Sequence, residues 1–392
     1  MSGCGSPAEV FRAFLKLGVS AFGGPVAHLG YFRDEFVRRR RWIDEAGYAE
    51  LVALCQFLPG PASSQVGFAL GLLRGGFPGA CLAWLAFTLP SALFMFLVAL
   101  GAGVYGGSFS QSVLHGLKLV AVAIVAQAVW GMARSLCPDL PRKTIALAAL
   151  VALLVLPGAW TQLAVIAAGA AVGGIACSGI APHETAMLRF PVSRRAGAIA
   201  LALYFVLLFG LPLLAVAVPG AALFEVFYRA GALVFGGGHV VLPLLEARVV
   251  GEGWTTADVF LAGYGAAQAV PGPLFTFAAY LGAAVGAQPL AGAVTALLGI
   301  FLPGFLLLVG ALPYWDAVRA RPAAHAVIAG ANAAVVGVLA AALYRPVWTS
   351  AVAALSDVLI ALLGFALLVR FKWPPWSVVL LTVAVTVMAA AY

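Results

Sequence analysis

The chain has 392 residues, of which 64% are hydrophobic and only 9% carry a charged side chain. Because a soluble domain uses about 25% charged residues to solvate its surface, this composition excludes a soluble protein and indicates a surface that faces lipid. The net charge of +8 does not indicate a nucleic-acid partner, since the cations lie in short loops between apolar runs. The five cysteines form no CxxC pair, which argues against a disulfide framework or a zinc site. We expect no metal and no cofactor.

One pattern occurs twice along the chain, at an offset that stays between 212 and 214 residues. The matched pairs are FLKLGVSAFGG at 14–24 with FYRAGALVFGG at 227–237, QFLPGP at 56–61 with QAVPGP at 268–273, Trp42 with Trp254, Pro90 with Pro303, and Gly116 with Gly330. Chance is a poor explanation for so constant an offset. We therefore predict an N-terminal repeat at 1–178, a linker at 179–222 and a C-terminal repeat at 223–392.

Each repeat is predicted to open with two interrupted helices. The apolar run 11–32 is broken by the sequence FGGP at 22–25, and the run 48–73 is broken by Pro59-Gly60-Pro61, because glycine and proline at this density stop a helix. Each flank is then about 10–13 residues long, too short for the roughly 20 residues that span a bilayer. This pattern predicts re-entrant hairpins of two half-helices. Complete spans are expected next, at 76–101, 111–133, 143–157 and 160–178, with one more span in the linker at 196–219.

The positions of the cations predict the topology. If the interrupted segments re-enter and the later segments cross, the loops on one side hold 16 Lys and Arg residues, and the opposite loops hold two, Arg248 and Arg345. The side with more cations is then cytoplasmic and includes the N-terminus; residues 1–10 lack the pattern of a cleaved signal peptide. Four crossings per repeat and one linker crossing place the second repeat upside down relative to the first. The expected fold class is an all-α polytopic membrane protein with two inverted repeats, a transporter architecture.

Two stretches of the first repeat carry a specific resemblance. FLKLGVSAFGGPVAHLGYFRDEFVRRRRW begins at Phe14 and YAELVALCQFLPGPASSQVGFALG begins at Tyr48; both closely resemble the chromate ion transporter family in its long, two-repeat form. The resemblance implies export of chromate from the cytoplasm, chromate resistance, and transport of the isosteric sulfate as a further activity, in a prokaryotic inner membrane. The second repeat departs from the first, with Gly238 in place of Pro25, and with Phe275-Thr276-Phe277 in place of Ser63-Ser64-Gln65.

The interrupted segments are predicted to form the substrate site. A half-helix begins after each Pro-Gly-Pro, and its free amides and positive dipole end suit an anion, while glycine lets the backbone approach closely. The alternative is that these glycines and prolines serve only as hairpin tips and packing positions. The candidate residues are Pro59, Gly60, Pro61, Ser63 and Ser64, then Pro271, Gly272, Pro273 and Thr276, and the glycines Gly23, Gly24, Gly236 and Gly237.

Two cations and two amides recur at equivalent positions of the repeats. Lys16 and Arg229 lie inside apolar half-helices, where a charge is rare and usually marks a transport pathway, so the pair could neutralise a dianion. The alternative is that these side chains snorkel to the interface. Gln56 and Gln268 stand one turn before Pro-Gly-Pro and could donate to the anion, or else hold helices together.

The coupling of transport is less clearly marked. Glu50 and Glu225 lie near segment starts and Asp357 is expected to cap a helix, so no carboxylate is expected deep in the membrane. His28 and His239 flank the Gly-Gly breaks and are candidate coupling residues. The membrane potential is the alternative driving force, because outward movement of a dianion is favourable by ~4.6 kcal/mol per 100 mV.

Other functions were weighed against chromate export. Uptake of sulfate or a related oxyanion is the alternative, because size and charge are alike. A membrane-embedded enzyme would need a His/Asp or metal cluster, and no HExxH or GxSxG arrangement occurs in a credible context. The expected partners are chromate, sulfate and the lipid bilayer, with no nucleic acid; a homodimer stays open.

The inverted topology can be tested by labelling single cysteines with a membrane-impermeant reagent. We expect probes in 33–41 and 313–325 to be labelled from the cytoplasm and probes in 246–254 from outside, because the cations lie on one side. Labelling of 33–41 and 246–254 from the same side would contradict inversion.

Overall fold

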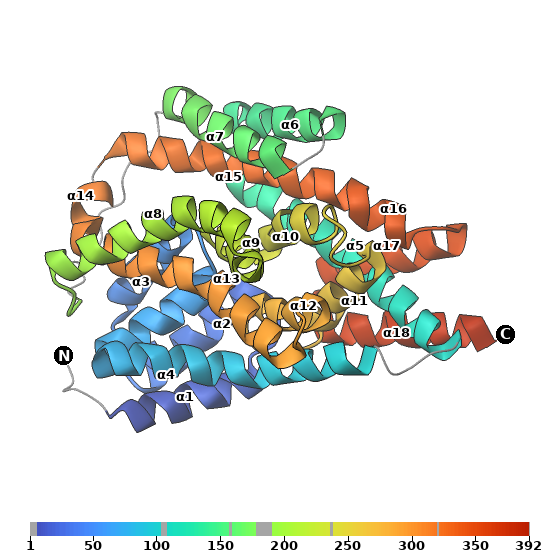
Figure 1. The fold of residues 1–392 in the computed structure, drawn as a ribbon, viewed down its shortest axis with the longest axis horizontal. Coiled ribbons are helices and arrows are strands. Elements are labelled where there is room, and N and C mark those ends of the chain that lie inside the picture. The colour runs from blue at the N-terminus through green and yellow to red at the C-terminus, as the bar shows by residue number, and fades with distance from the viewer. Residues whose placement is uncertain are drawn as a thin grey trace.

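The computed structural model describes residues 6–102, 108–156, 159–177, 190–235, 238–319 and 321–391, and these residues form helices and connecting turns without a strand (Figure 1). Five helical segments are long and apolar enough to cross a membrane: Ala62–Gly101, Gln111–Leu136, Arg194–Ala217, Pro289–Val318 and Pro322–Ala351. The prediction of an all-α polytopic membrane protein with two repeats is confirmed. The orientation of the repeats relative to a membrane stays a prediction.

The first repeat contains seven α-helices, and the linker contains one more. They are α1 (Pro7–Ser20), α2 (Gly24–Phe32), α3 (Glu45–Phe57), α4 (Ala62–Ala102), α5 (Ser108–Leu136), α6 (Leu140–Val155), α7 (Ala159–Ala176) and the linker helix α8 (Arg194–Ala217). The breaks between α1 and α2 and between α3 and α4 fall at the predicted FGGP and Pro-Gly-Pro sequences. The 16 residues of α6 extend about 24 Å, less than the roughly 30 Å of a bilayer core.

The second repeat follows the same order with shorter pieces. Its α-helices are α9 (Ala222–Ala232), α10 (Val241–Val249), α11 (Ala257–Gln268), α12 (Phe277–Val285), α13 (Pro289–Ala311), α14 (Trp315–Arg319), α15 (Pro322–Ala342), α16 (Thr349–Ala351), α17 (Leu355–Val369) and α18 (Pro375–Ala391). A short 3₁₀ turn, η3 (Gly238–Val240), precedes α10, and another, η4 (Leu274–Thr276), precedes α12. In the second repeat both breaks therefore lead into a 3₁₀ turn, whereas the corresponding breaks of the first repeat lead directly into an α-helix.

The long helix α4 is folded back on itself. Gly75 and Gly76 have non-helical dihedral angles, and a Cβ built on Gly71 would lie 2.6 Å from the carbonyl oxygen of Gly79. Residues eight apart in a straight helix are about 12 Å apart, so the arm 62–74 must pack against the arm 77–102. Gly282 of α12 and Gly292 of α13 make the same close approach in the second repeat. Each Pro-Gly-Pro lies at the other end of the first arm, away from this turn, and forms the tip between that arm and the preceding helix, α3 or α11.

The two repeats exchange one helix each. Helix α5 of the first repeat packs against α17 and α18 of the second, and α15 of the second packs against α6 and α7 of the first (Figure 1). Glycines at equivalent positions make both contacts close: Gly116 touches Val383 of α18, and Gly330 touches Gly169 and Gly173 of α7. Small residues let helices approach at distances where packing stabilises them in lipid. Each folded half is therefore built from both repeats.

This exchange predicts the effect of a larger side chain at its contact. Gly330→Leu should lower the free energy of unfolding by about 1–3 kcal/mol, because a Cβ at Gly330 would overlap the carbonyl oxygen of Gly169. The control is Gly131→Leu on α5, where no atom lies within 4 Å; there the helix propensity of leucine should leave stability equal or higher. The melting temperatures of both variants in detergent provide the comparison. Equal melting temperatures would contradict the α7–α15 contact.

Candidate functional site

The two Pro-Gly-Pro tips cross over between the repeats. The amide of Gly60 donates to the carbonyl oxygen of Val234 at 2.7 Å, and the amide of Gly272 donates to that of Ala21 at 3.0 Å. Val234 and Ala21 are equivalent residues that precede the two Gly-Gly breaks. Each tip is therefore bound to the break of the other repeat. We call these two tips, with Ala21 and Val234, the crossing.

Glycine is required at both tips of the crossing. Gly60 has φ +124° and Gly272 has φ +98°, a region that other residues rarely adopt. A Cβ at Gly60 would lie 3.0 Å from the Cα of Gly304 on α13, and a Cβ at Gly272 would lie 2.7 Å from the hydroxyl of Ser91 on α4. Each tip thus packs against a spanning helix of the opposite repeat. This geometry gives the two glycines a packing role, whether or not they also contact substrate.

Polar side chains of the first repeat surround the crossing. Ser63, Ser64 and Gln65, at the start of α4, are at most 4% exposed. The Gln65 amide donates to the carbonyl oxygens of Pro59 at 3.1 Å and Gly304 at 2.9 Å, and so joins the first tip to α13. Because both partners are acceptors, the Gln65 side-chain oxygen is left as an acceptor.

His28 is attached to the other side of the crossing. Its Nε2 lies 3.2 Å from the carbonyl oxygen of Ala21, which also accepts the Gly272 amide. A carbonyl oxygen can only accept, so Nε2 carries the proton and Nδ1 is an acceptor in the neutral ring. The ring is buried and stands edge-on to Phe87 at 5.2 Å.

In the first repeat, four buried side-chain atoms around the crossing have no hydrogen-bond partner among the described residues: His28 Nδ1, Ser64 Oγ, Gln65 Oε1 and Thr88 Oγ1. In the second repeat, Gln268 Nε2 is likewise buried and unpartnered. Buried polar atoms of native proteins are nearly always hydrogen-bonded, to protein, water or a ligand. Two of the four are hydroxyl oxygens that can donate as well as accept. The crossing therefore has unused hydrogen-bonding capacity.

The candidate residues of the second repeat are bound differently. The Thr276 hydroxyl donates to the carbonyl oxygen of Pro273 at 2.8 Å, within its own tip. Gln268 lies one turn before this tip at the end of α11, whereas Gln56 is exposed. His239 Nδ1 lies 2.7 Å from the Tyr264 hydroxyl. Gly236 and Gly237 lie outside the described residues.

The two candidate cations occur in separate ion pairs. Lys16 is 56% exposed and lies 3.9 Å from the buried carboxylate of Glu35. Arg229 lies 2.6 Å from Glu225, which is 3% exposed and also binds Arg248 at 3.3 Å. The two cations belong to different ion pairs, and each shares its carboxylate with other basic residues: Glu35 also binds Arg39 and Arg40, and Glu225 also binds Arg248.

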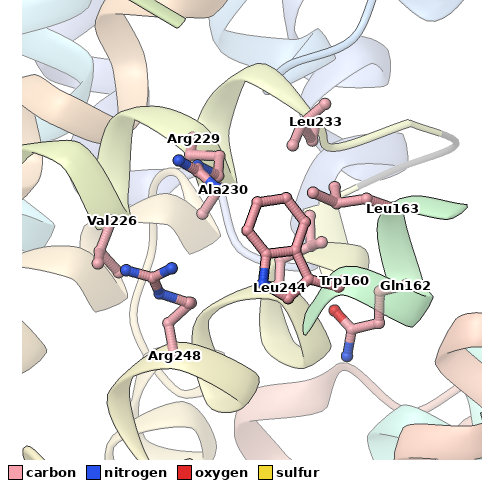
Figure 2. Close-up of a pocket in the computed structure, with 9 residues that line it drawn as sticks. All are labelled: Trp160, Gln162, Leu163, Val226, Arg229, Ala230, Leu233, Leu244 and Arg248. Atoms are coloured by element: carbon pink, nitrogen blue, oxygen red, sulfur yellow. The ribbon is translucent and has the colours of Figure 1, made fainter. Parts of the chain in front are cut away.

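Arg229 and Arg248 line a surface cleft between α7, α9 and α10, with the Trp160 ring between them and Gln162 (Figure 2). The Arg229 guanidinium lies 5.9 Å from the Trp160 ring centre. Pairing with Glu225 and stacking on an aromatic ring both stabilise this guanidinium where it stands.

Buried carboxylates are the feature that the sequence analysis missed. Glu35, Glu50, Glu225 and Asp357 are all at most 6% exposed, although Glu35 was not marked in the sequence analysis, and Glu225 was taken only as a residue near a segment start. Asp357 accepts from the amides of Ala353 and Ala354, as expected of a helix cap, and also binds His115 of α5 at 2.8 Å. The partners Trp315 of Glu50 and His115 of Asp357 lie 265 and 242 residues away, so spacing along the chain could not reveal them. Glu35 and Glu225 each have an arginine four residues later, a helical spacing that could have indicated these two ion pairs.

Comparison with known proteins identifies the family. The chromate transporter family matches residues 8–175 and again residues 221–388. The chain belongs to the chromate transporter family. A probable chromate transport protein of Synechococcus elongatus is 33% identical over 348 residues, which cover 85% of this chain and 83% of that protein.

Two further relatives of this transporter carry the same name. A chromate transport protein of Pseudomonas aeruginosa is 31% identical, and the matched region covers 85% of this chain and 79% of that protein. Another, of Cupriavidus metallidurans, is 30% identical over 93% of this chain and 88% of its own. No solved structure matches the chain. The resemblance to chromate ion transporters is thus confirmed, whereas the roles of individual site residues stay predictions.

The ion pairs predict different consequences for the two cations of this transporter. Arg229→Met should lower stability by about 3 kcal/mol, because it removes a partner from the buried Glu225 carboxylate. Lys16→Met should change stability little, because an exposed pair contributes little. If the cations bind substrate, both variants should also lose most chromate transport. Melting temperature and vesicle flux at matched protein levels measure the two effects.

The double variant Glu225→Gln/Arg229→Met is the control, since it removes the uncompensated charge and should recover stability. Wild-type flux in both single variants would exclude the cations as ligands.

Proposed function

We propose that this protein is a secondary transporter that exports chromate from the cytoplasm and confers chromate resistance. Family membership and the chromate transport proteins among its relatives support the substrate class. The observation that carries the site is the pair of buried, unpartnered hydroxyls, Ser64 and Thr88, which can donate to an oxyanion next to the N-terminus of α4. We place the oxyanion there, where two broken helices of each repeat meet.

The start of α4 supplies donors suited to an oxyanion. The first amides of a helix have no partner within it, and the helix dipole is positive at this end. The backbone N–H of Gln65 donates to the carbonyl oxygen of Pro61. The backbone N–H groups of Ala62, Ser63 and Ser64, which precede this bond, are left as donors. Oxyanions bind helix N-termini by this arrangement in many proteins.

The ion pairs that Lys16 and Arg229 form with carboxylates affect the driving force for substrate transport. Since Lys16 and Arg229 are each bound to a carboxylate, the substrate crosses with most of its negative charge. An inside-negative potential then favours exit by about 2.3 kcal/mol for each charge per 100 mV. His28 is the candidate for proton coupling, because it binds the same carbonyl oxygen as the second tip; His239, bound to Tyr264, is the second candidate.

The function can be tested in inside-out membrane vesicles. We expect vesicles that contain the protein to accumulate labelled chromate, which corresponds to export from the cell, and to do so faster when the lumen is positive. Vesicles without the protein are the control. Accumulation of chromate only in right-side-out vesicles would contradict export. Accumulation of sulfate but not chromate would instead identify a sulfate carrier.

A further inference from the structure

The buried, unpartnered hydroxyls at the crossing come from the first repeat, whereas the second repeat contributes Gln268, whose Nε2 is buried and unpartnered among the described residues. Ser63, Ser64 and Gln65 have Phe275, Thr276 and Phe277 as their counterparts. At the offset of 213 that relates Pro90 to Pro303, the counterparts of the remaining polar residues are apolar or lack a side chain: Val241 for His28, Phe301 for Thr88 and Gly304 for Ser91. The backbone of the crossing is symmetric, whereas its chemistry is not.

We propose that each chain has a single oxyanion site, held by the first repeat through the start of α4 and the hydroxyls of Ser64 and Thr88, and that the second tip serves as a brace. This inference rests on the proposed function and names which half of the crossing binds. The sequence differences show that the two tips are unequal, but the repeat pattern does not single out Thr88.

Among its described residues, the second tip has no unused hydroxyl, and only two amides, those of Leu274 and Phe275, precede its first turn bond. Its chain enters a 3₁₀ turn of three residues, in which the Thr276 amide donates to Pro273 at 3.0 Å, and the Thr276 hydroxyl donates to the same residue. The ring of Phe275 is 2% exposed and packs 5.8 Å from that of Phe301. Apolar rings thus occupy the positions where the first tip has serine and threonine.

The first tip keeps its donors, and the fold of α4 brings more of them level with it. Gly71 packs against Gly79 and Ala83 across the hairpin. With an equal rise per residue in both arms, this register places residue 64 level with about residues 86–90 of the returning arm. Thr88 lies in that interval, and its hydroxyl is buried and unpartnered like that of Ser64.

Gln65 acts as a positioning residue for this site. Its two amide hydrogens are used by Pro59 and Gly304, so it fixes the start of α4 against the tip and against α13. The second repeat has Phe277 here, which packs edge-on against Tyr264 at 5.8 Å and cannot make these bonds.

The equivalent pair Ser64 and Thr276 offers a matched test. Binding of labelled chromate to the full-length protein in detergent can be measured by equilibrium dialysis, together with the KM for chromate uptake by inside-out vesicles. Ser64→Ala and Thr88→Val should each weaken binding about tenfold or more, the effect of losing a hydrogen bond to a charged group. Thr276→Ala should leave Kd within about twofold, since its hydroxyl is used inside the tip.

Thr88→Ser keeps the hydroxyl and should restore binding, which a purely structural role for the threonine methyl would not do. Ser135→Ala, on an exposed turn of α5, controls for handling of the variants, and melting temperatures identify variants that do not fold. Should Ser64→Ala not fold, the Thr88 pair decides alone.

Three results would overturn the inference, and they differ from one another. Equal weakening by Ser64→Ala and Thr276→Ala would show a symmetric site. Unchanged Kd in all three hydroxyl-removing variants would place the anion elsewhere in a chain that still transports it. Absence of chromate binding and flux in the parent protein would remove the proposed function itself.

Discussion

The architecture depends on two backbone hydrogen bonds that cross between the repeats, from Gly60 to Val234 and from Gly272 to Ala21. A broken helix in lipid exposes amides and carbonyls that water cannot satisfy, and each costs several kcal/mol. Here the free amide of one tip satisfies a free carbonyl of the other repeat's break. Neither repeat can do this alone, because its own tip and its own break are bound to the partner. The exchange of α5 and α15 also makes each half depend on the other, because each of these helices packs against helices of the opposite repeat.

The ion pairs of the buried carboxylates involve other residues than the proposed substrate site. The buried carboxylates Glu35 and Glu225 each hold basic side chains within one repeat, which lowers the cost of placing cations against apolar surface. The crossing, by contrast, contains hydroxyl, amide and imidazole groups. A site of neutral donors and helix dipoles binds an anion less tightly than a site with a cationic side chain that contacts the anion. Weaker binding suits a carrier, because it must release its substrate on the other side.

The divergence of the two tips illustrates how a duplicated fold can divide its tasks. Both halves keep the glycine whose positive φ and close packing the crossing requires. Among the described residues, the first half keeps buried hydroxyls without a partner, Ser64 and Thr88, whereas the second keeps the Gln268 amide nitrogen. The aromatic residues of the second half fill the equivalent volume and pack on one another, as Phe275 and Phe301 do. The second tip therefore differs from the first in its side chains, while both tips keep the same backbone geometry at glycine.

The sequence by itself determined the membrane class, the twofold repeat and the positions of the helix breaks, because composition, offset and Gly/Pro content are local properties. The FGGP and Pro-Gly-Pro breaks and the linker helix occur near the expected residues, and helices occur at the expected spans, although α6 and α7 are shorter than the five helices that are long enough to cross a membrane. The candidate site was predicted as a list of residues near these breaks, and Gln65 and Thr88 were absent from it. Only the tertiary structure decided the contacts between the repeats: it bound each tip to the break of the other repeat, bonded Gln65 to Gly304, and left the Ser64 hydroxyl without a partner among the described residues. The physical reason is that a hydrogen bond depends on distance in space, and the partners at the crossing lie on opposite repeats, too far apart along the chain for any local pattern to encode.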